Sequence, residues 1–195
     1  MAKTTYEDMA IGDFSLKKIT IEYLTPFVKI ALEKYNGSDT VATVPDGTMK
    51  IEVNAFCDCE NLREVHFPPQ TCEFKSAFSK CPALEAIYFD TSSGIKFYQG
   101  AFYGIEQPIK VYFGGSSDVW QRSVADWYET ESEYDCGWGG GAPGLYSTTW
   151  RNSPMHHQLG EDFFIEVYCK GDDTTFIMHG KSSPRCITEK STPYD

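Results

Sequence analysis

The chain has 195 residues, with 28 Asp and Glu against 17 Lys and Arg, and its net charge at neutral pH is −11. So acidic a surface repels a phosphate backbone, which argues against nucleic-acid binding. A domain of this length buries roughly 70% of its unfolded surface, so it needs no disulfide or metal to hold it together. Aromatic residues make up 15% of the chain, which favours packed strands over disorder.

The cysteines and the apolar stretches exclude further classes. The seven cysteines are an odd number without the paired C-x-x-C spacing of a zinc site, so we expect free, mostly buried thiols. No stretch approaches the roughly 18 apolar residues of a membrane-spanning helix, so no membrane partner is expected. The first eight residues lack the apolar core of a secretory signal. We therefore expect a protein that stays inside the cell that makes it or is carried in a virus particle.

The first 38 residues are expected to form an N-terminal arm of capping strands. Residues 16–21 have the spacing L-x-x-I-x-I, which resembles a weak member of the repeats that follow. Residues 26–37 allow two interpretations. One is a short helix that is capped by Thr25 and ends at Gly37. The other is a strand hairpin that turns at Asn36-Gly37.

Three Ala-Phe pairs mark a repeat in the middle of the chain. The pairs begin at residues 55, 77 and 101, at intervals of 22 residues (55 to 77) and 24 residues (77 to 101). Four further columns align behind them, namely Cys59/Cys81/Ile105, Leu62/Leu84/Pro108, Val65/Ile87/Val111 and Phe67/Phe89/Phe113. A period of 20–29 residues with L-x-x-V-x-F spacing is typical of leucine-rich solenoids.

Elementary geometry turns this repeat into a fold. Alternating apolar residues such as Val65 and Phe67 predict a short strand with every second side chain turned inward. The Ala-Phe pairs then lie on another side of each coil, and neighbouring coils must stack, since one coil cannot bury its own apolar face. Val44-Pro45 corresponds to Phe67-Pro68, which predicts an earlier strand at Thr40–Val44. The predicted fold is a mainly β repeat solenoid of short leucine-rich-type coils over 39–128, with a C-terminal helix and strand-pair cap.

The phrase TVPDGTMKIEVNAFCDCENLREVHFP, residues 43–68, resembles the BspA-like leucine-rich repeat family. That family's unit reads I-P-x-x-V-x-x-I-x-x-x-A-F-x-x-C-x-x-L-x-x-V, and the resemblance covers about residues 27–128 and reaches 163–179. It departs from the pattern at Glu52-Val53 and at Pro108. The resemblance implies a protein-binding solenoid with adhesion or host-interaction roles. It also favours, for 26–37, a hairpin that leads into the strand at 41–44.

Gly114-Gly115 end the repeats. Ser116-Ser117-Asp118 then cap a predicted helix that contains Val119, Trp120, Val124 and Trp127. Residues 163–169 and 174–178 read as two strands joined by a turn at 171–173, and this pair (163–179) is expected to cap the open end of the solenoid. Residues 129–162 form a long inserted loop, and 180–195 are expected to be a loose polar tail.

The residues between the inward pairs face away from the core. They are Thr43, His66, Tyr88, Tyr112 and, in the cap, Tyr168, with Arg63, Glu64, Glu85 and Lys110 as neighbours. Solenoids present this sheet face as an extended binding surface, and aromatic residues are enriched in interfaces. A second interpretation is cross-strand aromatic pairing that only stabilises the sheet. Both interpretations remain open at this stage.

Signals for other chemistry are weak. The adjacent His156 and His157 diverge, the acidic residues of 129–135 lack the spacing of a calcium loop, and Gly137–Gly141 is not followed by a phosphate-binding Lys. No nucleophile elbow or cysteine–histidine set is present. We therefore expect no enzyme, cofactor or metal, and a protein partner of unknown identity. The alternatives are a structural component that self-assembles or joins a larger assembly, such as a virion component, and an acidic mimic of nucleic acid.

Overall fold

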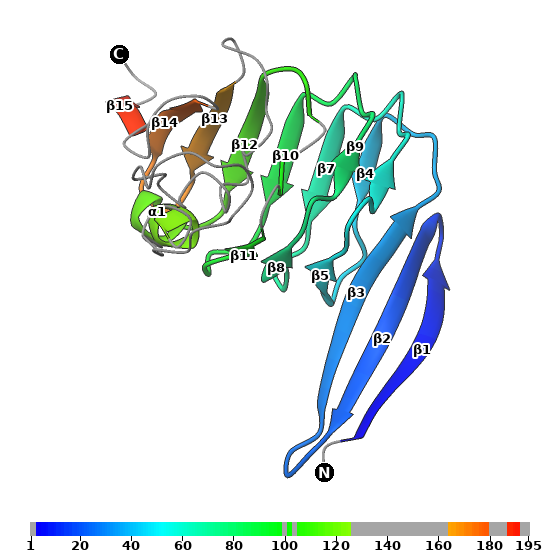
Figure 1. Ribbon diagram of the computed structural model, residues 1–195. Helices are drawn as coiled ribbons and strands as arrows, with labels where there is room; N and C mark the ends of the chain where they lie inside the picture. Colours follow the sequence, from blue (N-terminus) through cyan, green and yellow to red (C-terminus); the bar gives the residue numbers. More distant parts are fainter. Residues whose placement is uncertain (1–2, 99–100, 103–104, 126–163, 180–186, 192–195) are drawn as a thin grey trace, which may run out of the picture.

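The computed structural model describes residues 3–98, 101–102, 105–125, 164–179 and 187–191 (Figure 1). The chain winds into a mainly β solenoid with one short helix at its far end, as the repeat predicts. A seven-stranded sheet and a six-stranded sheet form two sides of the coils, and a two-stranded sheet forms the third. No helix in these ranges is long and apolar enough to span a bilayer.

The coils contribute their strands in a fixed order, at most one strand to each side. The seven-stranded sheet takes β4 (Val41–Thr43), β7 (Glu64–Phe67), β10 (Ala86–Phe89) and β12 (Ile109–Phe113) in parallel. The six-stranded sheet takes β5 (Thr48–Ile51), β8 (Glu73–Phe74) and β11 (Lys96–Phe97). The third side consists of β6 (Phe56–Cys57) and β9 (Phe78–Ser79). The predicted strand at Thr40–Val44 is therefore confirmed as β4.

The columns of the repeat form the core. The three Ala-Phe pairs and the inward strand residues are almost fully buried, and the phenylalanines of successive coils stack on one another. The Phe56 and Phe78 rings lie 5.4 Å apart at 22°, and the Phe67 and Phe89 rings lie 5.1 Å apart at 16°. The buried strand residues are the ones that the alternation predicts, so the predicted register is confirmed. A slip of one residue would bury the opposite face of every strand instead.

The N-terminal arm is a three-stranded antiparallel sheet that runs out beyond the coils (Figure 1). Its strands are β1 (Lys3–Ile11), β2 (Phe14–Glu22) and β3 (Phe27–Tyr35), and β3 joins the six-stranded sheet by pairing in parallel with β5. The expectation of a strand at 26–37 is confirmed. Two finer expectations are wrong. Residues 16–21 belong to the arm and not to a coil, and Asn36-Gly37 link two different sheets, since β4 pairs with β7 and not with β3.

The far end carries the expected helix and strand pair. The helix α1 (Ser117–Ala125) buries Trp120 and Val124, and Trp120 donates its indole N–H to the sulfur of Met178 at 3.4 Å. The strand β13 (Phe164–Cys169) pairs in parallel with β12 and antiparallel with β14 (Thr174–His179). Trp127 and the inserted loop 129–162, with His156 and His157, lie outside the described residues.

The expectation of a loose tail over 180–195 is wrong for one segment. Ile187–Ser191 form β15, which pairs antiparallel with β14 at the edge of the seven-stranded sheet. A polar sequence gives a weak strand signal. An edge strand nevertheless satisfies its backbone by hydrogen bonds to its neighbour, whatever the polarity of its side chains.

Candidate protein-binding face

The outward column of the seven-stranded sheet forms one continuous row across five strands. The strand register places Thr43 beside His66, His66 beside Tyr88, Tyr88 beside Tyr112, and Tyr112 beside Tyr168. We call His66, Tyr88, Tyr112 and Tyr168 the aromatic ladder. Parallel pairing stacks equivalent positions of neighbouring coils directly over one another, so one outward aromatic residue per coil is enough to build it.

The rings of the ladder stack face to face. The His66 and Tyr88 rings lie 4.2 Å apart at 2°, and the Tyr88 and Tyr112 rings lie 4.6 Å apart at 6°. The ladder ends in an edge contact, because the Tyr112 and Tyr168 rings are 6.1 Å apart at 67°. All four side chains are half-buried. The stacked faces cover one another, so the ring edges and hydroxyl groups are what this surface offers to a partner.

A second outward row runs two residues before the ladder. It consists of Val41, Glu64, Ala86, Lys110 and Glu166, each beside the next in register. Ala86 has only a methyl group where its row neighbours Glu64 and Lys110 carry long side chains. A hollow of about 450 Å³ opens at this place, lined by Glu64, Glu85, Ala86, Tyr88, Pro108, Ile109, Lys110, Tyr112, Phe164 and Glu166.

The hollow adds residues that the sequence prediction did not include. Glu166, Ala86 and Phe164 were not expected as site residues, although Ala86 and Glu166 lie in the row of two expected ones, Glu64 and Lys110. The same period of two that defined the ladder would have located this row. Within this row, the small side chain of Ala86 is the feature of the sequence that would have indicated a hollow.

Charged side chains border the ladder and pair with one another. Arg63 contacts Glu85 at 2.9 Å, His66 approaches Glu64 at 3.6 Å, and Lys110 approaches Glu166 at 3.8 Å. The Arg63 and Glu85 side chains are more than half exposed, so their ion pair is weak and can rearrange around a partner. The hollow itself is acidic, since Glu64, Glu85 and Glu166 face it with Lys110 as the one lysine among its lining residues.

Two tyrosines of the ladder have defined hydroxyl environments. Burial, together with the charge of Glu64 and the neighbouring Tyr112, raises the pKa of Tyr88 above its ordinary value, so its hydroxyl keeps its proton at neutral pH. Tyr168 donates its hydroxyl to Asp173 at 2.7 Å. Tyr88 is thus a hydrogen-bond donor at the centre of the ladder, whereas Tyr168 is held by the turn between β13 and β14.

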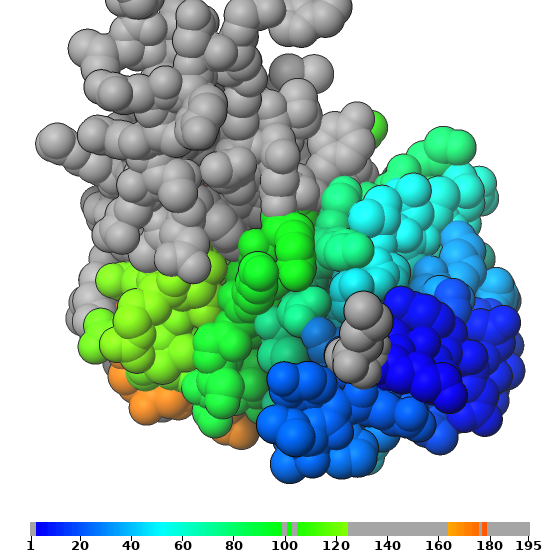
Figure 2. All heavy atoms as spheres, turned by 60° about the horizontal axis from the view of Figure 1, so that its bottom comes forward, coloured from blue at the N-terminus to red at the C-terminus, as the bar shows by residue number. Residues whose placement is uncertain are grey.

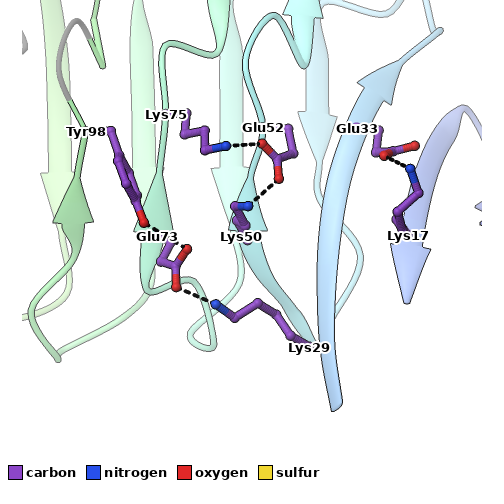
Figure 3. Close-up of polar contacts among 8 residues, drawn as sticks. All are labelled: Lys17, Lys29, Glu33, Lys50, Glu52, Glu73, Lys75 and Tyr98. Carbon is purple, nitrogen blue, oxygen red and sulfur yellow. Dashed lines mark hydrogen bonds and ion pairs between the residues drawn. The ribbon is translucent and has the colours of Figure 1, made fainter. Parts of the chain in front are cut away.

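The opposite, six-stranded sheet carries a different kind of surface (Figure 3). Glu52 pairs with Lys50 at 2.5 Å and with Lys75 at 2.7 Å, and Glu73 pairs with Lys29 and accepts a hydrogen bond from Tyr98 at 3.3 Å. Burial alone would raise the pKa of both carboxyl groups. The hydrogen bonds from these partners outweigh it and hold each pKa below its ordinary value. These charges satisfy one another within the sheet.

Other site chemistry does not assemble within the described ranges. No group of three or more His, Cys, Asp or Glu that could hold a metal forms there. The cysteines at 57, 59, 72, 81 and 169 are free thiols, and those at 59, 81 and 169 are buried.

A solenoid whose short strands pair in parallel from coil to coil, with a period of 22 to 24 residues, defines a leucine-rich repeat protein. The family model described as "BspA type Leucine rich repeat region (6 copies)" matches residues 29–123, and this region belongs to the BspA-type leucine-rich repeats. Searches of the curated proteins and of the solved structures returned no match. Leucine-rich repeats generally mediate protein interactions.

Proposed function

We propose that the chain is a non-catalytic protein-binding solenoid whose partner docks on the aromatic ladder and the hollow beside it. The observation that carries the proposal is the joint presence, on one sheet face, of a stacked aromatic row and a hollow of about 450 Å³ next to Tyr88 and Tyr112. Half-buried tyrosines offer large, rigid contact area together with a polar group, and such residues dominate interface energies.

The chemistry of the hollow selects the partner. Three carboxylates, two tyrosine rings and the methyl group of Ala86 line the opening. A lysine or arginine side chain of the partner fits this environment, because its apolar stem can lie on the rings while its charge meets the carboxylates. The net charge of −11 adds long-range attraction to a basic partner.

Capture of binding proteins from the native source tests the proposal. The full chain is compared with its Tyr88→Ala and Tyr112→Ala variants, and with Lys96→Ala on the opposite sheet as the matched control. A protein that the wild type and the control retain, and that both tyrosine variants lose, supports the ladder as the binding site. Equal retention by all four chains contradicts it. Binding of the purified partner then supplies the affinity.

The biological setting has two candidates. The BspA-type relationship favours adhesion or host interaction through the ladder. A structural role in a larger assembly, such as a virion, is favoured by the N-terminal arm, which runs out beyond the coils and carries exposed apolar residues (Figure 1). Copurification distinguishes the two roles. Recovery of the chain with assembled particles supports the structural role, whereas recovery only with a soluble or surface partner supports adhesion or host interaction.

A further inference from the structure

The free edge of β1 differs from the other edges of the two large sheets. Among the described residues, β11 ends the six-stranded sheet with two residues, β4 ends the seven-stranded sheet with three, and β15 pairs with β14 irregularly. Short or irregular edges discourage pairing with another chain. The strand β1 has nine residues, pairs with β2 without a bulge and contains no proline, so its outer edge is open to another strand.

The side chains around this edge are also unlike those of the rest of the molecule. Most of the strongly exposed large apolar side chains in the described ranges lie on the arm: Tyr6, Ile11, Tyr23, Leu24, Phe27 and Val28. Tyr6 lies opposite Ile19, and Ile21 lies opposite Phe27, so these four share one face of the arm. Figure 2 shows dark-blue β1 at the surface of the arm, on the side away from α1.

We propose that two copies of this chain associate through their β1 strands, which pair antiparallel about a two-fold axis at Thr5. The two arms then form one continuous antiparallel sheet, with Tyr6 of each copy opposite Thr4 of the other. This places the apolar faces of the two arms side by side. The proposal goes beyond the ladder and does not depend on a partner bound there.

The charges on β1 select the register. In a symmetric antiparallel pair, one residue lies opposite its own copy, and facing residues point to the same side of the sheet. Centring the pair on Thr5 places Lys3 of each copy opposite Glu7 of the other. Centring it on Glu7 or on Asp8 places identical carboxylates opposite each other, which is destabilising. Centring it on Tyr6 leaves Lys3 opposite Met9 and gains no ion pair.

The net charge of the arm makes association there feasible. Between Lys3 and Tyr35 the chain has five lysines (3, 17, 18, 29 and 34) and five carboxylates (7, 8, 13, 22 and 33), so this segment is neutral. The charge of −11 therefore lies on the remainder of the chain. Contact through β1 joins the two copies at their neutral parts and keeps the acidic coils apart, whereas contact between coils would bring like charges together.

Sedimentation of the full chain over a range of concentrations tests for the dimer directly. We expect a monomer–dimer equilibrium. Lys3→Glu and Glu7→Lys should each raise the dimer dissociation constant by about tenfold or more, because each replaces two attractive cross-strand pairs by repulsive ones. The double variant K3E/E7K restores opposite charges across the axis and should recover most of the affinity. A monomer at every concentration, or no recovery in the double variant, overturns the proposal.

Cross-linking tests the register independently of charge. Under mild oxidation Thr5→Cys should form a disulfide-linked dimer, because the two thiols lie directly opposite each other. Asp8→Cys is the matched control, since the two copies of residue 8 lie about 20 Å apart in this register. The wild-type chain gives the background from its own cysteines. Equal cross-linking of the two variants excludes the Thr5 register. Tyr88→Ala and Tyr112→Ala should leave the dimer intact, which separates this proposal from the function of the ladder.

Discussion

The phenol ring of Tyr88 lies parallel to that of Tyr112, with the ring centroids 4.6 Å apart and the ring planes 6° apart. The strand register places these two residues side by side on β10 and β12. Stacking covers the ring faces and leaves the ring edges and the hydroxyl groups beside the hollow. The same contact also stabilises the sheet, so binding and stability have to be measured separately.

We expect Tyr88→Ala and Tyr112→Ala each to weaken partner binding by about 1–3 kcal/mol. Each should also lower the free energy of unfolding by about 0.5–1.5 kcal/mol through the lost ring contact. Tyr88→Phe keeps the stack and removes only the hydroxyl group, so it should weaken binding with little change in stability. Calorimetric binding and urea unfolding of the same variants check this. Full affinity in both alanine variants would place the binding site elsewhere.

Phe78 is fully buried in the central coil, where its ring packs on Phe56 and Phe74. We expect Phe78→Ala to lower the free energy of unfolding by about 3–5 kcal/mol, through lost apolar burial and the cavity that remains. Urea unfolding measures the change. Val53→Ala, at an exposed apolar position, is the control and should cost less than about 0.5 kcal/mol. A loss below about 1 kcal/mol at Phe78 would contradict the packing described above.

The carboxylate of Asp172 accepts hydrogen bonds from the Ser117 backbone N–H at 3.1 Å and from the Ser117 hydroxyl at 2.6 Å. It thereby satisfies a donor at the N-terminus of α1 and complements the positive end of the helix dipole. We expect Asp172→Ala to lower the free energy of unfolding by about 1 kcal/mol. Thermal unfolding checks this, with the exposed Glu106→Ala as control. An unchanged midpoint in Asp172→Ala would show that this contact contributes nothing.

The ion pairs of Glu52 and Glu73 predict a pH dependence of stability. The pKa of both carboxyl groups is lowered in the folded chain, so their contribution is fully present above the ordinary glutamate pKa of about 4.3. It is lost as the pH falls through the lowered values. At neutral pH, Glu52→Gln and Glu73→Gln should therefore melt below the wild type, and this gap should shrink as the solution becomes acidic. A gap of constant size would exclude this linkage.

The buried thiols predict a pattern of chemical labelling. Burial raises the pKa of Cys169 to about 12, and hydrogen bonding to Cys81 together with burial raises the pKa of Cys59. Since the thiolate is the reactive form, Cys59 and Cys169 should react slowly with a thiol reagent. Cys81 should also react slowly, because its side chain is almost fully buried and out of reach of the reagent, whereas Cys57 is only half-buried. Peptide mapping by mass spectrometry of the native chain measures each site. Labelling of Cys59 and Cys81 as fast as after unfolding would contradict their burial.

The sequence alone determined the coils of this protein and the direction in which the side chains of the aromatic ladder point. The columns that contain Phe56, Phe67 and Val65 recur every 22 to 24 residues, and only one strand register buries them all. That register also turns His66, Tyr88 and Tyr112 outward, so the ladder could be predicted before the structure. Alternation along a strand and the recurrence of a phrase are properties of the residue order alone, so a sequence records them directly.

The tertiary structure decided which strands pair. Residues 16–21 have the spacing of a repeat strand, yet they pair antiparallel with β1 and β3, because alternation predicts a strand without naming its neighbour. The hollow also depends on strand pairing, because pairing places the small side chain of Ala86 between the longer side chains of Glu64 and Lys110. The cap of α1 comes from Asp172, which is 55 residues from Ser117. Contacts between distant segments depend on how the coils stack, and no local pattern in the sequence encodes that arrangement.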